Sequence, residues 1–211
     1  MKKIKQQRIF NPVRDKSLSG TNGVKKIIAE ISARHLHIAQ ADLEKLFGKN
    51  YSLKHFKDLS QPGEFASAEQ VEVIGAKNKL TMRIVGPVRK QTQLELALSD
   101  ARFLGVQPMI RVSGDLKGTP GGLTLKGPQG SLKLKTGVIV AQRHLHLSTK
   151  DARAWRLKNG QLVKAKVKGQ RALEFDNIVV RVGNYVSRIH LDTDEANAAG
   201  LLSCSKIDLQ I

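Results

Sequence analysis

The chain has 211 residues and a formal net charge of +18, so it is long enough to bury one domain or two small ones and basic enough to attract anions. No apolar run approaches the roughly 20 residues of a membrane helix, and no signal-peptide pattern is present. A single cysteine, Cys204, excludes a disulfide framework and a cysteine-rich zinc site, and we expect a cytoplasmic protein that does not bind membranes.

The first segment, residues 1–23, is polar, basic and rich in turn-forming residues, and we interpret it as a flexible extension. From Val24 onward, short strands separated by Gly-containing turns dominate. The predicted hairpins span residues 70–85, 123–135 and 162–175, with turns at 75–78, at 127–130 and at Gly169. Closely spaced strands of this kind predict a mainly β chain, built as barrels or as a sandwich.

Four short helices are predicted between the strands, and each one ends at a glycine. They span residues 39–48, 99–105, 148–160 and 192–200. In the third, Ser148 is the predicted N-cap, with Asp151 three residues later. We expect that helix to continue as far as Asn159 and Gly160.

The sequence Arg-His-Leu-His occurs twice, at residues 34–37 and 143–146, each time ahead of a predicted helix. In a strand, residues two apart lie on the same face, so the two histidines of each copy point the same way. Leu36 and Leu145 then point to the opposite, apolar side. The repeat indicates a structural duplication, with two similar units facing each other.

The histidine pairs predict metal binding, because two imidazoles on one strand face can share an ion. The pairs are His35 with His37 and His144 with His146. Two nitrogens do not complete a site, and the best further ligands are Glu95, which shares a strand face with Gln93, and His190, at another strand end. Asp42 and Asp151 each fall in a first helical turn, where a carboxylate favours the helix dipole, so we expect them to be structural. His55 is expected at the surface.

Several longer stretches occur in an order that we associate with one family. They include "RHLHIAQADLEKLFG", "DLSQPGEFA", "GPVRKQTQLEL", "SGDLKGTPG", "GVIVAQRHLHLSTKDA" and "HLDTDEANAAGL". From about Ile28 to Leu201 the chain resembles the propanediol-utilisation type of phosphotransacylase, also called phosphate propanoyltransferase. The resemblance implies exchange of a short-chain acyl-CoA and phosphate with acyl phosphate and CoA.

The resemblance also implies an internally duplicated fold of two small β-barrels capped by short α-helices, with the active site between them. The first barrel would take residues 24–33 and 142–211, and the second residues 34–141. Members bind two metal ions, usually zinc. By position, one ion would be held by His35, His37 and Glu95, and the other by His144, His146 and His190.

Further roles are carried over by position. Arg89 matches the family's phosphate-binding arginine, Ser113 and Gly122 lie in its glycine-rich loop near the reacting groups, and Gln61 falls in a matching motif. The reaction needs no covalent acyl-enzyme. We therefore interpret Cys204 as a small buried residue and not as a nucleophile.

Two other hypotheses remain at this point. A cupin-like enzyme with a single metal also uses a His-x-His strand, but here the pattern occurs twice. A basic nucleic-acid-binding barrel is supported by charge alone, because no aromatic residues alternate with Lys or Arg as stacking platforms would.

The resemblance to this family implies functional coupling to an acetate or propionate kinase, and it is compatible with a homodimer. No clear amphipathic helix of the kind that directs some members into bacterial microcompartments precedes the first histidine pair.

Overall fold

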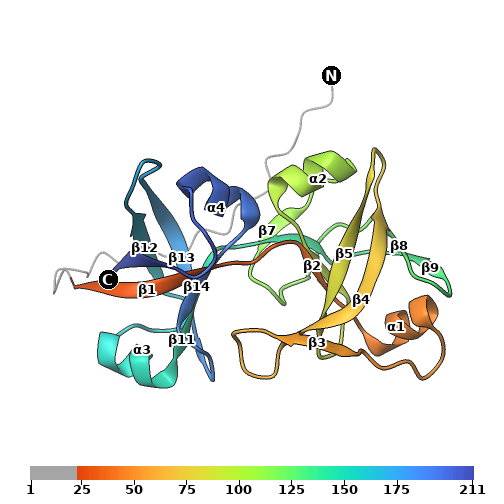
Figure 1. Cartoon of the computed structure of the whole chain (residues 1–211), viewed down its shortest axis with the longest axis horizontal. Helices are drawn as coiled ribbons and strands as arrows, with labels where there is room; N and C mark the ends of the chain where they lie inside the picture. Colours follow the sequence, from red (N-terminus) through yellow and green to blue (C-terminus); the bar gives the residue numbers. More distant parts are fainter. Residues whose placement is uncertain (1–22) are drawn as a thin grey trace.

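The computed structural model describes residues 23–211, so the predicted extension lies outside the described residues apart from Gly23. Strands dominate the described part, and four short helices lie between them (Figure 1). This confirms the predicted mainly β fold. The helices are α1 (Gln40–Phe47), α2 (Leu98–Leu104), α3 (Thr149–Trp155) and α4 (Thr193–Ala199). None of them is long and apolar enough to cross a bilayer.

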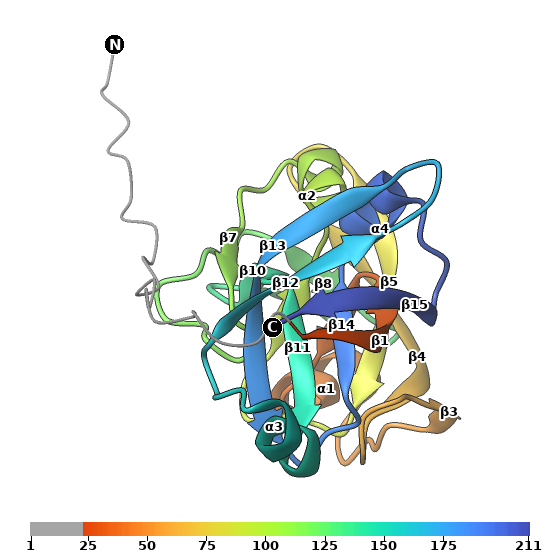
Figure 2. The same ribbon diagram turned by 90° about the vertical axis from the view of Figure 1, so that its left-hand side faces the viewer.

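Six strands form a closed barrel, which faces the viewer in Figure 2. They are β1 (Val24–Ile31), β11 (His144–Ser148), β12 (Leu162–Val167), β13 (Leu173–Gly183), β14 (Arg188–Leu191) and β15 (Ser205–Gln210). The order around the barrel is β1-β14-β11-β13-β12-β15, and the first and last strands pair with each other. Strand β1 is thus held between two strands from the other end of the described chain.

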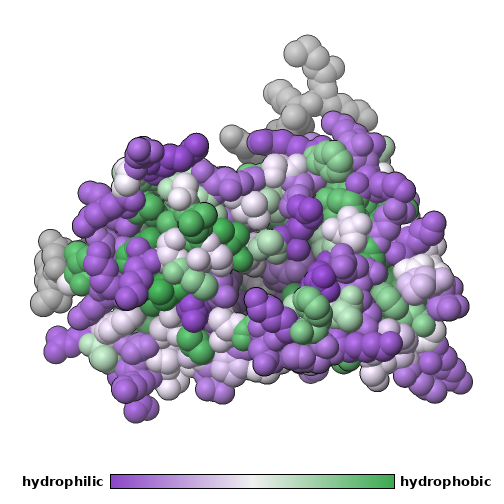
Figure 3. All heavy atoms as spheres, in the orientation of Figure 1, coloured by the Kyte–Doolittle hydropathy of each residue, from purple (hydrophilic) through white to green (hydrophobic). Residues whose placement is uncertain are grey.

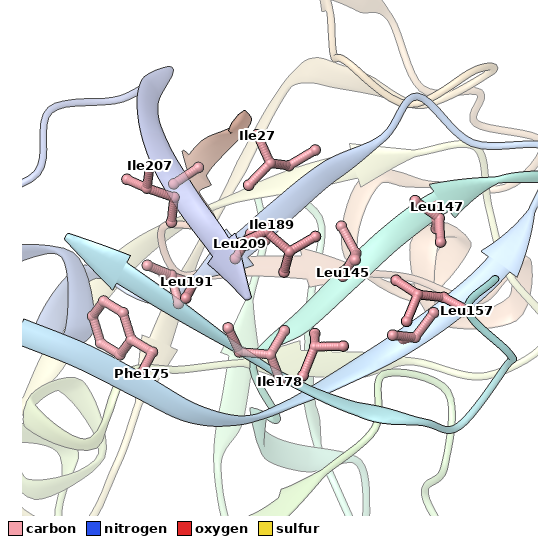
Figure 4. Packing of buried hydrophobic residues seen from close by; sticks show 14 of the residues in the cluster. Ile27, Leu145, Leu147, Leu157, Phe175, Ile178, Ile189, Leu191, Ile207 and Leu209 are labelled. Carbon is pink, nitrogen blue, oxygen red and sulfur yellow. The ribbon is translucent and has the colours of Figure 1, made fainter. Parts of the chain in front are cut away.

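The barrel encloses its own apolar core (Figure 4). Leu145, Ile178, Ile189 and Leu209 come from four different strands and expose no surface. Because side chains alternate along a strand, the residues between these core positions face outward. His144 and His146 flank Leu145 in this way, so the barrel core turns both histidines out of the barrel.

The second unit is a nine-stranded sheet with the order β7-β10-β6-β2-β5-β4-β8-β9, and β3 pairs with β4 at its side. Its strands are β2 (His35–His37), β3 (His55–Asp58), β4 (Phe65–Ile74), β5 (Lys79–Gly86), β6 (Gln93–Glu95), β7 (Met109–Arg111), β8 (Thr124–Lys126), β9 (Ser131–Lys133) and β10 (Val138–Ala141). A separate core fills it, with Leu36, Ile84 and Leu94 fully buried. Leu36 and Leu145 both lie in a core, as the sequence predicts.

The three predicted hairpins are present as the antiparallel pairs β4–β5, β8–β9 and β12–β13. Helices α1, α2 and α4 end where predicted, at Gly48, Gly105 and Gly200. Helix α3 does not reach Gly160, and the prediction of its end was wrong. It stops at Trp155 because Arg156 adopts a left-handed conformation with φ of 55° and turns Leu157 into the barrel core.

The two units meet through side-chain contacts as well as through the chain crossings at residues 32–34 and 142–143. Ser99, in α2, donates from its backbone N–H and its hydroxyl to the Asp194 carboxylate, in α4, at 2.8 and 2.6 Å. These bonds fix the start of one helix against the start of the other. Hydrophilic side chains cover much of the face seen in Figure 3.

Cys204 differs from its expected position. It is exposed, not buried, and it occupies a left-handed turn with φ of 63° ahead of β15. A left-handed residue in a tight turn sits at the surface, because the chain reverses there, and this explains the exposure.

Candidate functional site

The two histidine pairs occupy equivalent places in the two units. Strand β2 lies between parallel β5 and antiparallel β6, and β11 lies between parallel β13 and antiparallel β14. The antiparallel neighbour supplies the third candidate ligand each time. His35 is directly opposite Glu95, and His144 is directly opposite His190. The structure therefore brings together both of the ligand sets expected from the sequence.

In the first set, the geometry fits a metal ion. His35 Nε2 lies 3.1 Å from His37 Nε2, and each of these atoms lies 3.8 Å from a Glu95 carboxylate oxygen. Ligand atoms at about 2.0 to 2.1 Å from a tetrahedral zinc ion are about 3.3 to 3.4 Å apart. The three donors need only small adjustments to meet that spacing.

Backbone carbonyls fix the imidazoles of this set. His35 Nδ1 lies 2.9 Å from the Ala33 carbonyl oxygen, and His37 Nδ1 lies 3.3 Å from that of Val85. When Nδ1 carries the proton and donates it, the lone pair on Nε2 is free for a metal. Both Nε2 atoms point to the same place, as a shared ion requires.

The second set is built the same way, from three histidines. His144 Nδ1 lies 2.9 Å from the Gln142 carbonyl oxygen, which repeats the His35 contact. The donor atoms of His144, His146 and His190 all lie within 4.8 Å of one another. His146 Nδ1 is buried and has no hydrogen-bond partner in residues 23–211. A buried imidazole with an unsatisfied nitrogen fits a site for a cation.

Four of the candidate histidine ligands are held in the neutral form that metals bind. Burial is the main cause of a lowered pKa in these four, to about 3 for His37 and His190, to about 2 for His146, and below the usual value for His144. Burial alone would raise the pKa of Glu95. The adjacent His35 and His37, with the hydrogen bond from Ser113, outweigh it and lower that pKa to about 2. Glu95 is thus a carboxylate, and the first set carries one negative charge that the second lacks.

Both sets face one cavity of about 630 Å³ between the two units. Its walls include all six candidate ligands and the other sequence-predicted site residues Gln61, Arg89 and Ser113. Gly122 is not among the lining residues. It adopts φ of +91° in the 112–123 loop and donates its N–H to the Leu134 carbonyl, at 2.9 Å.

Arg89 and Ser113 are already oriented by protein groups. Arg89 donates to the Glu64 carboxylate at 2.8 Å, and its backbone N–H binds the Ile38 carbonyl, also at 2.8 Å. Ser113 donates to Glu95 at 2.7 Å. Ser113 thus holds one of the candidate ligands as well as lining the cavity.

Gln61 contacts the opposite unit. Its side-chain amide donates to the Val186 carbonyl and accepts from the Val186 N–H, both at 3.2 Å, and it lies 3.4 Å from His190 Nε2. A reciprocal pair of this kind resembles a strand pairing. The loop that carries Gln61 is thereby attached to the loop after β13.

Several lining residues were not expected from the sequence. Tyr185 stacks on the His146 ring, with centroids 4.2 Å apart and an interplanar angle of 15°. Glu30 Oε2 lies 3.8 Å from His190 Nε2, and Arg181 and Arg83 also reach the cavity. The alternation of side chains indicates which positions of a strand face outward, but not which strands lie beside the histidine strands. These residues can therefore be recognised only once the strand register is known.

The residues set aside in the sequence are accounted for. His55 is exposed and contacts Asp58 at 2.7 Å, as predicted for a surface residue. Asp42 and Asp151 lie in the first turns of α1 and α3, outside the lining of the cavity. Cys204 is also outside it.

Comparisons with known proteins show the family of the chain. The sequence profile of the phosphate propanoyltransferase family matches residues 28–202. The chain is similar to the phosphate propanoyltransferase of Thermotoga maritima, with 47% identity over 178 residues that cover 83% of this chain and 84% of the relative. It is 42% identical to that of Sebaldella termitidis over 96% of both chains, and 38% identical to that of Clostridioides difficile over 92% of this chain and 93% of the relative. The chain therefore belongs to the phosphate propanoyltransferase family, and it is a phosphate acyltransferase.

Proposed function

We propose that this acyltransferase interconverts a short-chain acyl-CoA plus phosphate with an acyl phosphate plus CoA, by direct transfer assisted by two zinc ions. The observation that carries the proposal is the arrangement of two three-residue ligand sets and Arg89 around one cavity of about 630 Å³. A cavity in this size range can hold small reactants together. The name of the relatives supports propanoyl groups among the substrates.

Zinc suits the donors. Imidazole nitrogens and a carboxylate are zinc ligands, and zinc also accepts sulfur. We assign His35, His37 and Glu95 to one ion and His144, His146 and His190 to the other. When bound, zinc would polarise the acyl carbonyl and stabilise the CoA sulfur as a thiolate.

The residues of the chain bind and orient the reactants. We assign Arg89 to phosphate, because its planar guanidinium can hold two phosphate oxygens at once. A phosphate oxygen then attacks the carbonyl carbon, the carbon–sulfur bond breaks, and its electron pair leaves on sulfur. Holding two reactants in line contributes about 7 to 11 kcal/mol in favourable cases. Glu64, which pairs with Arg89, keeps the guanidinium in place.

The remaining predicted residues have supporting parts in this proposal. Ser113 lines the cavity and holds Glu95. Gln61 forms the wall beside His190 and contacts substrate from there. Gly122 belongs to the loop that carries Ser113, and its positive φ lets that loop turn.

The rival hypotheses explain less. A cupin-like enzyme needs one metal set, and this cavity presents two. Nucleic-acid binding rests on net charge alone. The matches to acyltransferases over most of the chain support neither alternative.

Other parts of the proposal come from the sequence. They are coupling to an acetate or propionate kinase, a cytoplasmic location, assembly as a homodimer, and the division into barrels of residues 24–33 with 142–211 and of residues 34–141. Each of them stays a prediction.

A single assay tests the main proposal. Zinc-loaded protein is incubated with acetyl-CoA, propanoyl-CoA or butanoyl-CoA, with and without phosphate, and both CoA and acyl phosphate are measured. We expect equal amounts of CoA and acyl phosphate, only with phosphate present, and loss of both after chelation. CoA release without acyl phosphate would mean hydrolysis and would contradict the proposal, as would full activity in protein shown to be metal-free.

A further inference from the structure

Strand β13 places an arginine directly beside the second ligand set. In the parallel pairing of β11 with β13, Arg181 is opposite His146. The neighbours Val180 and Ile178 are fully buried in the barrel core, so Arg181 lies on the outward face that His146 shares. Arg181 is also one of the residues that line the cavity.

Four arginines line this cavity, and three of them have protein partners. Arg34 pairs with Asp100 at 3.0 Å, Arg89 pairs with Glu64 at 2.8 Å, and Arg83 donates to the Ser67 carbonyl at 2.6 Å. Within residues 23–211, Arg181 has neither a hydrogen bond nor an ion pair. Its side chain is partly exposed and lines the cavity, so its donors are available to an anionic ligand there.

The electrostatic surroundings of Arg181 favour an anion. The second ligand set contains no carboxylate, in contrast to the first, which contains Glu95. The nearby acid Glu30 already accepts a hydrogen bond from Ser60. A cation held by the histidines would add to the positive potential, and an anion between that cation and Arg181 would relieve the repulsion.

We propose that Arg181 is a second phosphate-binding arginine, which holds the phosphoryl group of phosphate or acyl phosphate from the barrel side of the cavity. Arg89 belongs to the sheet side, so the two guanidinium groups approach the same anion from opposite units. This inference rests on the proposed function for the identity of the anion. It goes further in assigning a role to a residue outside both ligand sets.

CoA also carries phosphate groups, and the experiment separates these two sources. Arg181→Gln removes the charge, and Arg181→Lys keeps the charge but loses the planar pair of donors. Arg153→Gln is the matched control, because Arg153 is exposed on α3 and does not line the cavity. Initial rates are measured with varied phosphate at saturating acyl-CoA, with varied acyl-CoA at saturating phosphate, and in reverse with varied acyl phosphate. Dephospho-CoA thioester, which lacks the 3′-phosphate, is compared with the normal substrate.

We expect Arg181→Gln to raise the KM for phosphate and for acyl phosphate about tenfold to a hundredfold, as loss of a charge-assisted hydrogen bond does. Arg181→Lys should show a smaller rise. The KM for acyl-CoA, the preference for the 3′-phosphate and the zinc content should stay as in the unchanged protein and in Arg153→Gln. An unchanged KM for phosphate would overturn the inference. So would a defect confined to acyl-CoA that disappears with the dephospho substrate, or loss of zinc.

A binding measurement gives a readout without turnover. Phosphate is added to zinc-loaded protein, and the rise in melting temperature is recorded for the unchanged protein, Arg181→Lys and Arg153→Gln. We expect phosphate to raise the melting temperature equally in the unchanged protein and in Arg153→Gln, and clearly less in Arg181→Lys. An equal rise in all three proteins would overturn the inference. If the unchanged protein forms no acyl phosphate but still shows an Arg181-dependent rise, the proposed reaction fails while the anion site stands.

Discussion

Arg143 lies 2.7 Å from Glu195, so the residue before the second histidine pair is joined to the first turn of the helix after His190. The first copy repeats this relationship, with Arg34 and Asp100 at 3.0 Å and Asp100 in the first turn of α2. In both copies the acid follows the third candidate ligand by the same number of residues. These ion pairs explain the arginine in each copy of Arg-His-Leu-His. The arginine connects the histidine strand to the helix that follows the strand of the third ligand.

Loss of this tie should weaken the second ligand set. Glu195 also accepts the Asp192 N–H, so Glu195→Gln keeps a similar shape while removing the charge that pairs with Arg143. We expect zinc affinity at that set to fall by about tenfold, the lower end of the range for contacts that support metal ligands, because the Arg143 contact acts on the strand and not on a ligand directly. Competition with a chelator measures the affinity. Glu174→Gln, at an exposed position, is the control, and equal affinities in the two variants would show that the contact does not support the metal set.

The two ligand sets should lose their metals separately. His35→Ala and His144→Ala should each reduce the zinc content from about two ions per chain to about one, because each removes one donor of a three-residue set. Elemental analysis measures the content. His55→Ala is the matched control, since His55 is exposed and away from both sets. A single ion in the unchanged protein, unaffected by His144→Ala, would contradict the two-metal proposal.

Arg89→Lys should impair the use of phosphate. The lysine retains the positive charge but loses the paired donors, and we expect a loss of about tenfold to a hundredfold in the phosphate-dependent rate. Steady-state kinetics with phosphate and acyl-CoA varied in turn measure it, with Arg102→Lys, an exposed position on α2, as control. Zinc content should not change. Normal phosphate kinetics combined with weak acyl-CoA binding would mean that Arg89 has another role.

Cys204→Ser should retain most of the activity. Cys204 is exposed and outside the cavity lining, and direct transfer needs no acylated side chain. Initial rates and mass spectrometry of the protein after mixing with acyl-CoA check this. A loss of several orders of magnitude, or an acyl group trapped on Cys204, would indicate a covalent route.

Acid should destabilise the metal-free protein. His37, His146 and His190 keep pKa values of about 2 to 3 in the fold, whereas the usual value is 6.5. At pH values below 6.5, the unfolded chain binds more protons than the folded one. The free energy of unfolding therefore falls as the pH falls from 6.5, by up to about 1.4 kcal/mol per pH unit for each histidine. Glu95, whose pKa is lowered to about 2, acts in the same direction at more acidic pH.

Denaturant titrations at several pH values measure this dependence. We expect the dependence to be at least as steep with bound zinc between about pH 7 and pH 5, because ligation also keeps the histidines neutral in the folded state while those of the unfolded chain take up protons. A free energy of unfolding that stays constant over that range in metal-free protein would contradict the prediction.

The histidine pairs could be predicted from the sequence because the strand period alone places His35 with His37 and His144 with His146 on one face. The position of Arg181 opposite His146 could not be predicted, because it depends on the register of two parallel strands that are far apart in sequence. The end of α3 was missed for a local reason. Arg156 takes the left-handed conformation that glycine usually supplies, and nothing in its side chain signals that. The exposure of Cys204 depends on a turn of the same kind.

Strand β1 pairs with β14 and β15, and these partners lie more than 150 positions further along the chain, as in the pairing of Ala29 with Ile189. The strands of the second sheet occupy one continuous stretch, residues 35–141, and they can pair as they emerge from the ribosome. During synthesis, β1 must therefore wait with unpaired edges while the whole second sheet is made. A ribosome that stalls before residue 188 releases a chain with an open strand edge, which makes translation arrest in that interval a specific hazard for aggregation.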